Sequence, residues 1–393
     1  MNSEWPHMPP GVAAVSYARM IINRVSSGMP NDGFTVDWAR APLTTADHRT
    51  AQLSFVDLSA PEAVGILTPS RVITQVCASA YGYDSARLSV NLNDRPEVHS
   101  HASALKWGRG AASGGGRYCV NIYLVHSGDD ALAAGVYMYS VITGAWERLQ
   151  RHGRAAELGE LQGHAFHAIS YVVLTIDYWR SAFKYNDFAY QATSMDIGTF
   201  FGAERESLGA SGEGSWDMDV DEIGVAQLLG IDAEHEGVYA IQGWGSRTGA
   251  QVTGTVTPAP RSLPRYQRDI EPITFVTTGA MQRDMAIESP QRASSDTVRA
   301  VMAPPAREQS YEGMARLQAR ETSFGRFSGA SIARENLHAL LDAGRVAAQW
   351  ALSASSLRPE LAYLVYANGV DGLAEGLYIE RDGELAMLDD GDQ

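Results

Sequence analysis

Short apolar runs alternate along the chain with segments in which apolar residues recur every three to four positions. The short runs are rich in β-branched residues and are bounded by glycine and polar residues, which is typical of strands. They are 120–125, 135–140, 145–149, 168–176 and 237–241. The segments with helical spacing are 15–25, 68–83, 188–208, 221–230 and 332–347. This mixture predicts an α+β fold.

The positions of the prolines predict which parts of the chain form domains and which form connecting segments. Residues 1–65 and 256–308 are interrupted by prolines, so we expect an N-terminal arm lying on another surface and a linker or wrapped arm. The regular pattern between them predicts one domain over 66–255. Residues 309–393 repeat part of that domain in the same order. We expect them to form a partial second half-domain.

The repeat is visible in two short motifs. Tyr123-Leu124-Val125 followed by Gly135 recurs as Tyr363-Leu364-Val365 followed by Gly376. The second copy has Ser355-Ser356-Leu357 where the first copy has a glycine-rich loop.

The amino-acid composition and the net charge limit the kinds of protein that this chain can be. Hydrophobic residues make up 45% of the chain and charged residues 20%, which indicates a folded globular protein. The sequence shows neither an apolar run long enough to span a membrane nor a signal-peptide core, so we expect a cytoplasmic protein without membrane contact. The net charge of −15 repels phosphate backbones and argues against nucleic acid as a partner.

Cysteines and histidines suggest no metal site. Cys77 and Cys119 have no ligand spacing and are predicted to be reduced structural thiols. His164 and His167 could share a helix face, but no third ligand stands near them in the sequence.

A glycine-rich segment, 106–118, runs directly into the predicted strand 120–125. Glycines allow backbone to approach a flat or anionic ligand closely, while Ser113, Arg109 and Arg117 offer hydrogen bonds and charge. The segment is therefore either a cofactor loop or a flexible turn. It is not a Walker or Rossmann motif, because it leads into a strand rather than a helix.

Residues 179–190 follow the strand 168–176 and place five aromatic residues around Arg180 and Lys184. We predict a loop leading into the helix 188–208. A lysine that loses solvent there can accept a proton near neutral pH, which is the catalytic interpretation of Lys184 beside Tyr185. The alternative is a lysine that buries its stem and keeps its ammonium group in water.

Three segments together resemble the flavin-dependent nitroreductase-like superfamily. Within it they are most similar to the azoline dehydrogenases, which oxidise thiazolines and oxazolines in ribosomally made peptides such as those of thiopeptide-type antibiotic pathways. The segments are 113–118 running into 122–125, Lys184-Tyr185 followed by Tyr190 and Asp196-Ile197-Gly198, and 320–327 with Ile332 and Leu337. The sequence departs from the family at Cys119, where proline is usual, and in its truncated second copy.

The resemblance implies a nitroreductase-like fold with a central, mainly antiparallel sheet flanked by helices. It also implies FMN as cofactor, Lys184 as general base and Tyr185 as its hydrogen-bonding or proton-relay partner. The cofactor-binding residues implied are Arg109, Ser113, Gly114 and Gly115 along the flavin, and Arg320, Ser323 and Arg326 at its phosphate and ribityl chain. A capped, solvated helix start is the alternative explanation of the arginines at 320 and 326.

The same resemblance suggests partners. We expect an azoline-containing precursor peptide as substrate, a cyclodehydratase as partner, and either a homodimer or an intrachain pseudo-dimer. In the pseudo-dimer, Arg320, Ser323 and Arg326 would face Ser113 and Gly114. Two other functions stay open: a nitro- or quinone-reducing flavin enzyme on the same fold, and a non-catalytic scaffold for the peptide–cyclodehydratase complex.

Overall fold

The computed structural model divides the chain into two compact units, 1–85 with 107–320 and 86–106 with 321–393. The predicted arm and linker, 1–65 and 256–308, thus fall within the first unit. The structure describes residues 12–27, 35–58, 68–88, 105–163, 167–208, 216–247, 275–286, 313, 315–320, 328–351, 362–381 and 383–389.

The first unit is built on a six-stranded sheet with strand order β1-β6-β5-β4-β7-β8. Its neighbouring strands pair antiparallel, which confirms the predicted mainly antiparallel sheet. The strands are β1 (Gln52–Ser54), β4 (Val120–His126), β5 (Gly135–Ser140), β6 (Ala145–Gln150), β7 (His167–Asp177) and β8 (Glu236–Arg247). A separate two-stranded sheet joins β2 (Tyr83–Leu88) and β3 (Leu105–Arg109).

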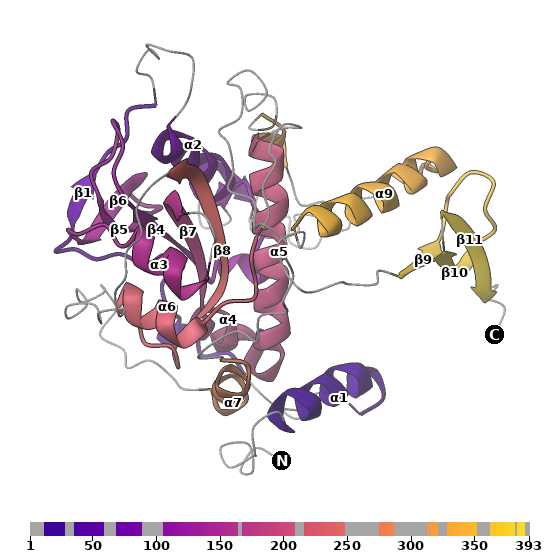
Figure 1. The fold of residues 1–393 in the computed structure, drawn as a ribbon. Coiled ribbons are helices and arrows are strands. Elements are labelled where there is room, and N and C mark those ends of the chain that lie inside the picture. Colours follow the sequence, from indigo (N-terminus) through magenta and orange to yellow (C-terminus); the bar gives the residue numbers. More distant parts are fainter. Residues whose placement is uncertain are drawn as a thin grey trace. The chain divides into compact units, whose positions relative to one another are not determined.

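Helices cover both faces of this sheet (Figure 1). Helices α3 (Ala155–Leu161) and α6 (Glu222–Leu229) cover one face, where Leu158 and Leu228 join a core cluster with Tyr123 and Val173 of the sheet. On the other face lie α2 (Pro69–Val76), the π-helical turn Cys77–Tyr81 and the long helix α5 (Ala189–Leu208). Both faces are therefore buried, and β4 is buried along its whole length.

The predicted loop at 179–190 is wrong, because the chain enters a helix as soon as β7 ends. Helix α4 spans Tyr178–Tyr185, and the short 3-10 helix Asn186–Phe188 leads on to α5. Burial explains the helix: Arg180 and Phe183 are buried, and Arg180 Nε lies 3.1 Å from Asp177 Oδ2 at the helix start. Tertiary packing stabilises a helix here although the local sequence indicates none.

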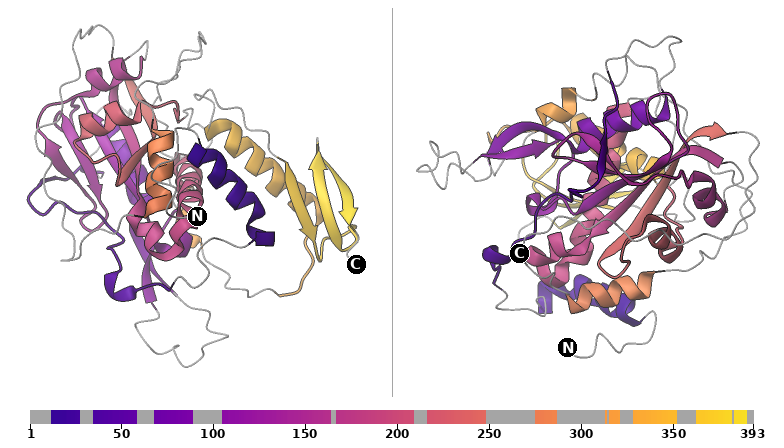
Figure 2. Two further views of the ribbon diagram at one scale, coloured as in Figure 1. Left: turned by 90° about the horizontal axis from the view of Figure 1, so that it is seen from below. Right: turned by 90° about the vertical axis from the view of Figure 1, so that its left-hand side faces the viewer.

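Helices α1 (Val12–Ser27) and α7 (Val276–Met285) lie side by side in the first unit (Figure 2). Their contact buries Ala13, Tyr17, Ala280 and Met281, and the backbone N–H of Ala14 donates to Asp284 at 3.1 Å. Helix α7 forms inside the segment predicted to be irregular, because the proline-free stretch between residues 272 and 290 is long enough for one.

The second unit contains helix α9 (Arg334–Ala351) and a three-stranded antiparallel sheet. Its strands are β9 (Tyr363–Ala367), β10 (Gly376–Arg381) and β11 (Glu384–Asp389). One local contact recurs in both units: Tyr378 Oη donates to Ala374 O at 2.9 Å, as Tyr137 Oη donates to Ala133 O at 2.7 Å.

The order of strands in the repeat matches β4-β5-β6, but the residue alignment read from the sequence is one position off. Tyr137 pairs with Leu124, whereas the corresponding Tyr378 pairs with Val365. Leu124 is therefore equivalent to Val365 rather than to Leu364.

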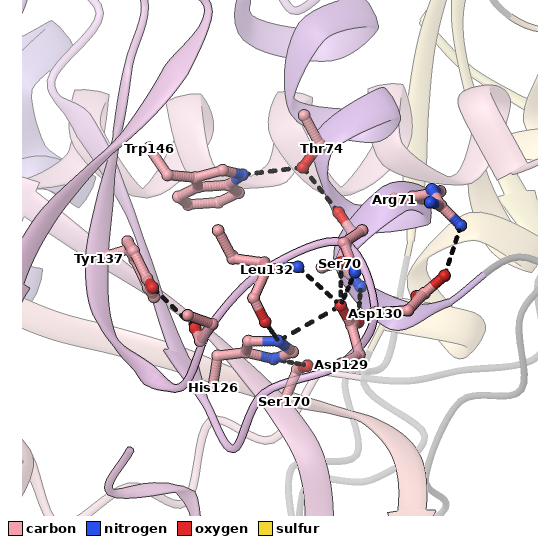
Figure 3. Close-up of polar contacts among 12 residues, drawn as sticks. Ser70, Arg71, Thr74, His126, Asp129, Asp130, Leu132, Tyr137, Trp146 and Ser170 are labelled. Carbon is pink, nitrogen blue, oxygen red and sulfur yellow. Dashed lines mark hydrogen bonds and ion pairs between the residues drawn. The ribbon is translucent and has the colours of Figure 1, made fainter. Parts of the chain in front are cut away.

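A half-buried carboxylate, Asp129, joins the β4–β5 loop to the start of α2 (Figure 3). Asp129 accepts hydrogen bonds from Ser70 N at 3.0 Å and from Ser70 Oγ at 2.7 Å, and its own loop supplies two further backbone donors. His126 Nε2 lies 3.6 Å from Asp129 Oδ1. Burial acts to raise the pKa of Asp129, but the nearby imidazole of His126 and the hydrogen bonds from Ser70 outweigh it and hold this pKa well below its ordinary value.

The variant Asp129→Asn should lower the free energy of unfolding at pH 7 by about 2 kcal/mol, because its amide nitrogen would face donors. A lowered folded-state pKa gives stability that is present above the ordinary carboxyl pKa and is lost as the pH falls through the lowered value. Urea denaturation should therefore show the difference persisting at pH 5 and shrinking only in strong acid. The control Asp130→Asn removes an exposed partner of Arg71 and should change stability by less than about 0.5 kcal/mol; equal losses in both variants would contradict the prediction.

Candidate active site

The glycine-rich segment forms a tight loop that leads into β4, as predicted. Gly114–Gly116 make a single 3-10 turn. Gly115 and Gly116 have φ values of 57° and 65°, and Tyr118 at the end of the loop has φ 50°. Left-handed backbone costs glycine little, but it strains a tyrosine.

Helix α5 fixes this loop through Asp196. Ser113 Oγ donates to Asp196 Oδ2 at 2.6 Å, and Gly114 N donates to Asp196 Oδ1 at 2.8 Å. One turn further on, Thr199 Oγ1 donates to Ala112 O at 2.6 Å. Charged acceptors form the stronger protein hydrogen bonds, so these contacts fix the loop against the helix.

The structure brings Lys184 and Tyr185 to the same loop from the end of α4. A Cβ atom built on Gly115 would lie 2.3 Å from Lys184 Nζ and 2.6 Å from Tyr185 Oη. Both side chains are half-buried, and Lys184 Nζ lies 5.2 Å from the centroid of the Tyr185 ring. Two segments about seventy residues apart in sequence thus meet at a glycine that leaves room for an amine and a phenol.

Backbone strain is concentrated here. Among the described residues, the two non-glycine residues with positive φ are Tyr118 and Asn186, the latter at φ 44° and ψ −123°. Asn186 directly follows Tyr185, and Tyr118 closes the glycine loop. Strained residues persist where surrounding contacts over-determine them, and they cluster at functional sites.

The electrostatics of the site favour a neutral phenol. Burial, and after it the charge of Asp196, raise the pKa of Tyr185, while Arg117 acts to lower it. Burial also raises the pKa of Asp196, although hydrogen bonds from Gly114, Ser113 and Cys119 oppose this. Tyr185 is therefore a hydrogen-bond donor at neutral pH.

Arg109 lies beneath the loop rather than on its surface. Its side chain is 1% exposed, and its guanidinium carbon lies 3.9 Å from the ring centroid of Tyr118 and 4.7 Å from that of Tyr81. It donates to the carbonyl of Thr44 at 3.0 Å. Cation–π contacts of this kind support Tyr118 in its strained conformation.

Arg320 also contacts the backbone leading into the loop. It donates to the carbonyls of Gly110 at 2.7 Å and of Arg109 at 3.0 Å. The other two residues implied at the FMN phosphate, Ser323 and Arg326, lie outside the described residues.

The contacts of Arg320 predict that Arg320→Ala lowers the free energy of unfolding of flavin-free protein by about 1 to 2 kcal/mol, because two carbonyls lose a charged donor. Chemical denaturation without added FMN measures this directly. The control Arg316→Ala removes an exposed partner of Glu206 and should have an effect below about 0.5 kcal/mol. A residue that served only to bind phosphate would leave the flavin-free protein unchanged.

Asp196 belongs to one of the segments that carry the sequence resemblance, but the resemblance implies no role for it. A second signal is its position on a buried helix face, with Thr193, Ile197 and Phe200. A carboxylate at such a position requires hydrogen-bond partners, and here the glycine loop supplies them.

Other kinds of site find less support in the described part of the chain. No three His, Cys, Asp or Glu side chains are grouped there so as to hold a metal ion. Cys77 and Cys119 are free and buried, as predicted. His167 begins strand β7 rather than a helix. None of the described helices has the length and apolar character needed to cross a membrane.

No protein-family model matches the sequence, and no curated protein matches it. The fold does match solved structures. A protein from Anabaena variabilis assigned as a nitroreductase aligns with a TM-score of 0.65 at 18% identity, covering 97% of this chain and 79% of its own. The fold is therefore nitroreductase-like, as the sequence predicts.

Two weaker matches cover less of the chain. The E. coli microcin synthetase McbBCD complex with truncated pro-MccB17 bound aligns with a TM-score of 0.36 at 14% identity, covering 63% of this chain and 88% of that one. A second protein assigned as a nitroreductase, from Ralstonia eutropha, has a TM-score of 0.29 at 13% identity, covering 49% and 92%. These scores are too low to support an inference about function.

Proposed function

We propose that this protein is an FMN-dependent azoline dehydrogenase, an oxidoreductase that converts thiazolines or oxazolines in a precursor peptide into thiazoles or oxazoles. One observation carries the proposal: Lys184 Nζ and Tyr185 Oη both lie against Gly115 of the serine–glycine loop. The nitroreductase-like fold and the sequence resemblance support the same chemistry.

The site has features that suit a flat cofactor. Gly114 and Gly115 present backbone without side chains beside an amine and a phenol, so a planar ring can approach closely. The Ser113 hydroxyl is engaged by Asp196 and by Tyr118 N, which leaves the loop backbone as the surface facing the ring. As the sequence resemblance implies, we assign the phosphate and ribityl chain to Arg320, Ser323 and Arg326.

In the proposed reaction the ring C–H next to the carbonyl loses its proton to Lys184 Nζ, and the electron pair forms the new ring double bond. The neighbouring C–H leaves as hydride, for which bound FMN supplies the two-electron acceptor. Lys184 has to be an uncharged amine to accept the proton. Tyr185, protonated at neutral pH, donates a hydrogen bond beside it and orients the reacting ring.

The partners belong to the same proposal. A precursor peptide whose azolines are made by a cyclodehydratase would be the substrate. The flavin site would be completed by a second copy of the chain or by residues 309–393 of the same chain.

A visible absorption spectrum of the purified full-length protein tests the proposal first. We expect a flavin band, quenching of FMN fluorescence by the flavin-free protein, and conversion of an azoline peptide with a loss of two mass units per ring. A colourless protein that does not quench added FMN would favour a scaffold. A second candidate, suggested by the fold, is a nitro- or quinone-reducing enzyme, which rapid NAD(P)H oxidation without azoline conversion would favour.

A further inference from the structure

Every hydrogen bond to the Asp196 carboxylate is donated by its partner, and the carboxylate accepts all of them. The N–H groups of Tyr118 and Gly114 can only donate, the first to Ser113 Oγ at 2.7 Å and the second to Asp196 Oδ1. Because Ser113 Oγ accepts from Tyr118, its own hydrogen points to Asp196 Oδ2. Cys119 Sγ also donates to Oδ2, at 3.4 Å. Every partner donates, so the site requires an acceptor with two oxygens, which is a carboxylate.

Asp196 is also buried without a cationic partner in the described part of the chain. Its side chain is 7% exposed, and the titratable groups that face it are Cys119, Tyr81 and Tyr185. Burial raises the pKa of all three groups, so they are neutral at pH 7. In the described part of the chain, the negative charge of Asp196 is therefore balanced by three hydrogen-bond donors, which are Ser113 Oγ, Gly114 N and Cys119 Sγ.

The loop that Asp196 fixes is the loop that Lys184 and Tyr185 face. Gly114, bonded to Asp196, is followed by Gly115, against which Lys184 Nζ and Tyr185 Oη lie. We infer that Asp196 is the positioning residue of the site: its carboxylate holds the glycine loop in register with Lys184 and Tyr185. After burial, the charge of Asp196 also acts to raise the pKa of the Tyr185 phenol. The inference rests on the proposed function only in taking Lys184 and Tyr185 as the reacting pair.

The test uses the full-length protein without flavin, so a failure of the proposed chemistry does not affect it. In Asp196→Asn, the Gly114 and Tyr118 amides should exchange with solvent at least roughly tenfold faster, because an amide side chain cannot accept from all three donors. With 3-fluorotyrosine at position 185, the ¹⁹F titration should show a lower pKa for this phenol in Asp196→Asn than in wild type.

Two further variants keep the test decisive. Glu204→Gln changes another buried acid of α5, whose partners are Trp216 and Gln242, and should leave both measurements unchanged. Ser113→Ala removes one donor but keeps the charge, so it should speed exchange at Tyr118 while the phenol pKa stays in place; it also replaces Asp196→Asn if that variant does not fold. Unchanged exchange and an unchanged phenol titration in Asp196→Asn would overturn the inference.

Discussion

Replacing Lys184 with alanine is expected to lower the rate of azoline oxidation roughly 10²- to 10⁴-fold, the usual contribution of a positioned base, while FMN still binds. Lysine is rare in this protein: Lys106 and Lys184 are the only two among 31 basic residues. Arginine remains protonated in proteins and cannot serve as a base. A lysine at the glycine loop of an arginine-rich chain therefore fits a chemical requirement better than a need for positive charge alone.

Turnover of an azoline peptide, followed by mass spectrometry, measures this effect, and the flavin absorption band monitors cofactor binding. Lys184→Arg should be as inactive as Lys184→Ala, whereas Lys106→Arg should retain turnover. The same Lys106→Arg background leaves one lysine, so selective ¹³C-lysine labelling gives a single side-chain signal whose pH titration reports on Lys184. Turnover of Lys184→Ala within about twofold of wild type would remove the base assignment.

The sequence predicts those parts of the fold whose stability depends on local pattern. The β-branched run 168–176 becomes β7, and the helical spacing of 188–208 becomes α5, because each pattern matches the burial that its element experiences. Helix α4 was not predictable in this way, since its aromatic and basic residues acquire helical order only when Arg180 and Phe183 are buried.

The candidate site likewise contains some residues that the sequence could identify and others whose roles it could not. Lys184, Tyr185 and the glycine loop could be selected from the sequence, because residue type and family resemblance indicate their chemistry. The roles of Asp196, Arg109 and Arg320 could not, since each depends on which distant backbone groups its side chain meets. The backbone partner that each of these side chains meets is fixed by the tertiary fold and cannot be identified from the sequence alone.

Adding a methyl group at Gly115 should disturb the reacting pair more than it disturbs the fold. The Cβ of Gly115→Ala would lie 2.3 Å from Lys184 Nζ and 2.6 Å from Tyr185 Oη, so both side-chain ends must move. A displacement of about 1 Å at a reacting group lowers rates roughly 10²-fold. The left-handed backbone at φ 57° adds a stability cost of about 1 kcal/mol for alanine.

Gly116→Ala is the matched control, because Gly116 has φ 65° and a Cβ built there meets no atom within 4 Å. Both variants should lose about the same stability in chemical denaturation, but only Gly115→Ala should shift the ¹³C signal of Lys184 in flavin-free protein. Since the backbone strain is matched, a difference in turnover between the two variants isolates the displacement of Lys184 and Tyr185. Equal turnover, with the Lys184 signal unmoved in both, would mean that the contact at Gly115 does not position the pair.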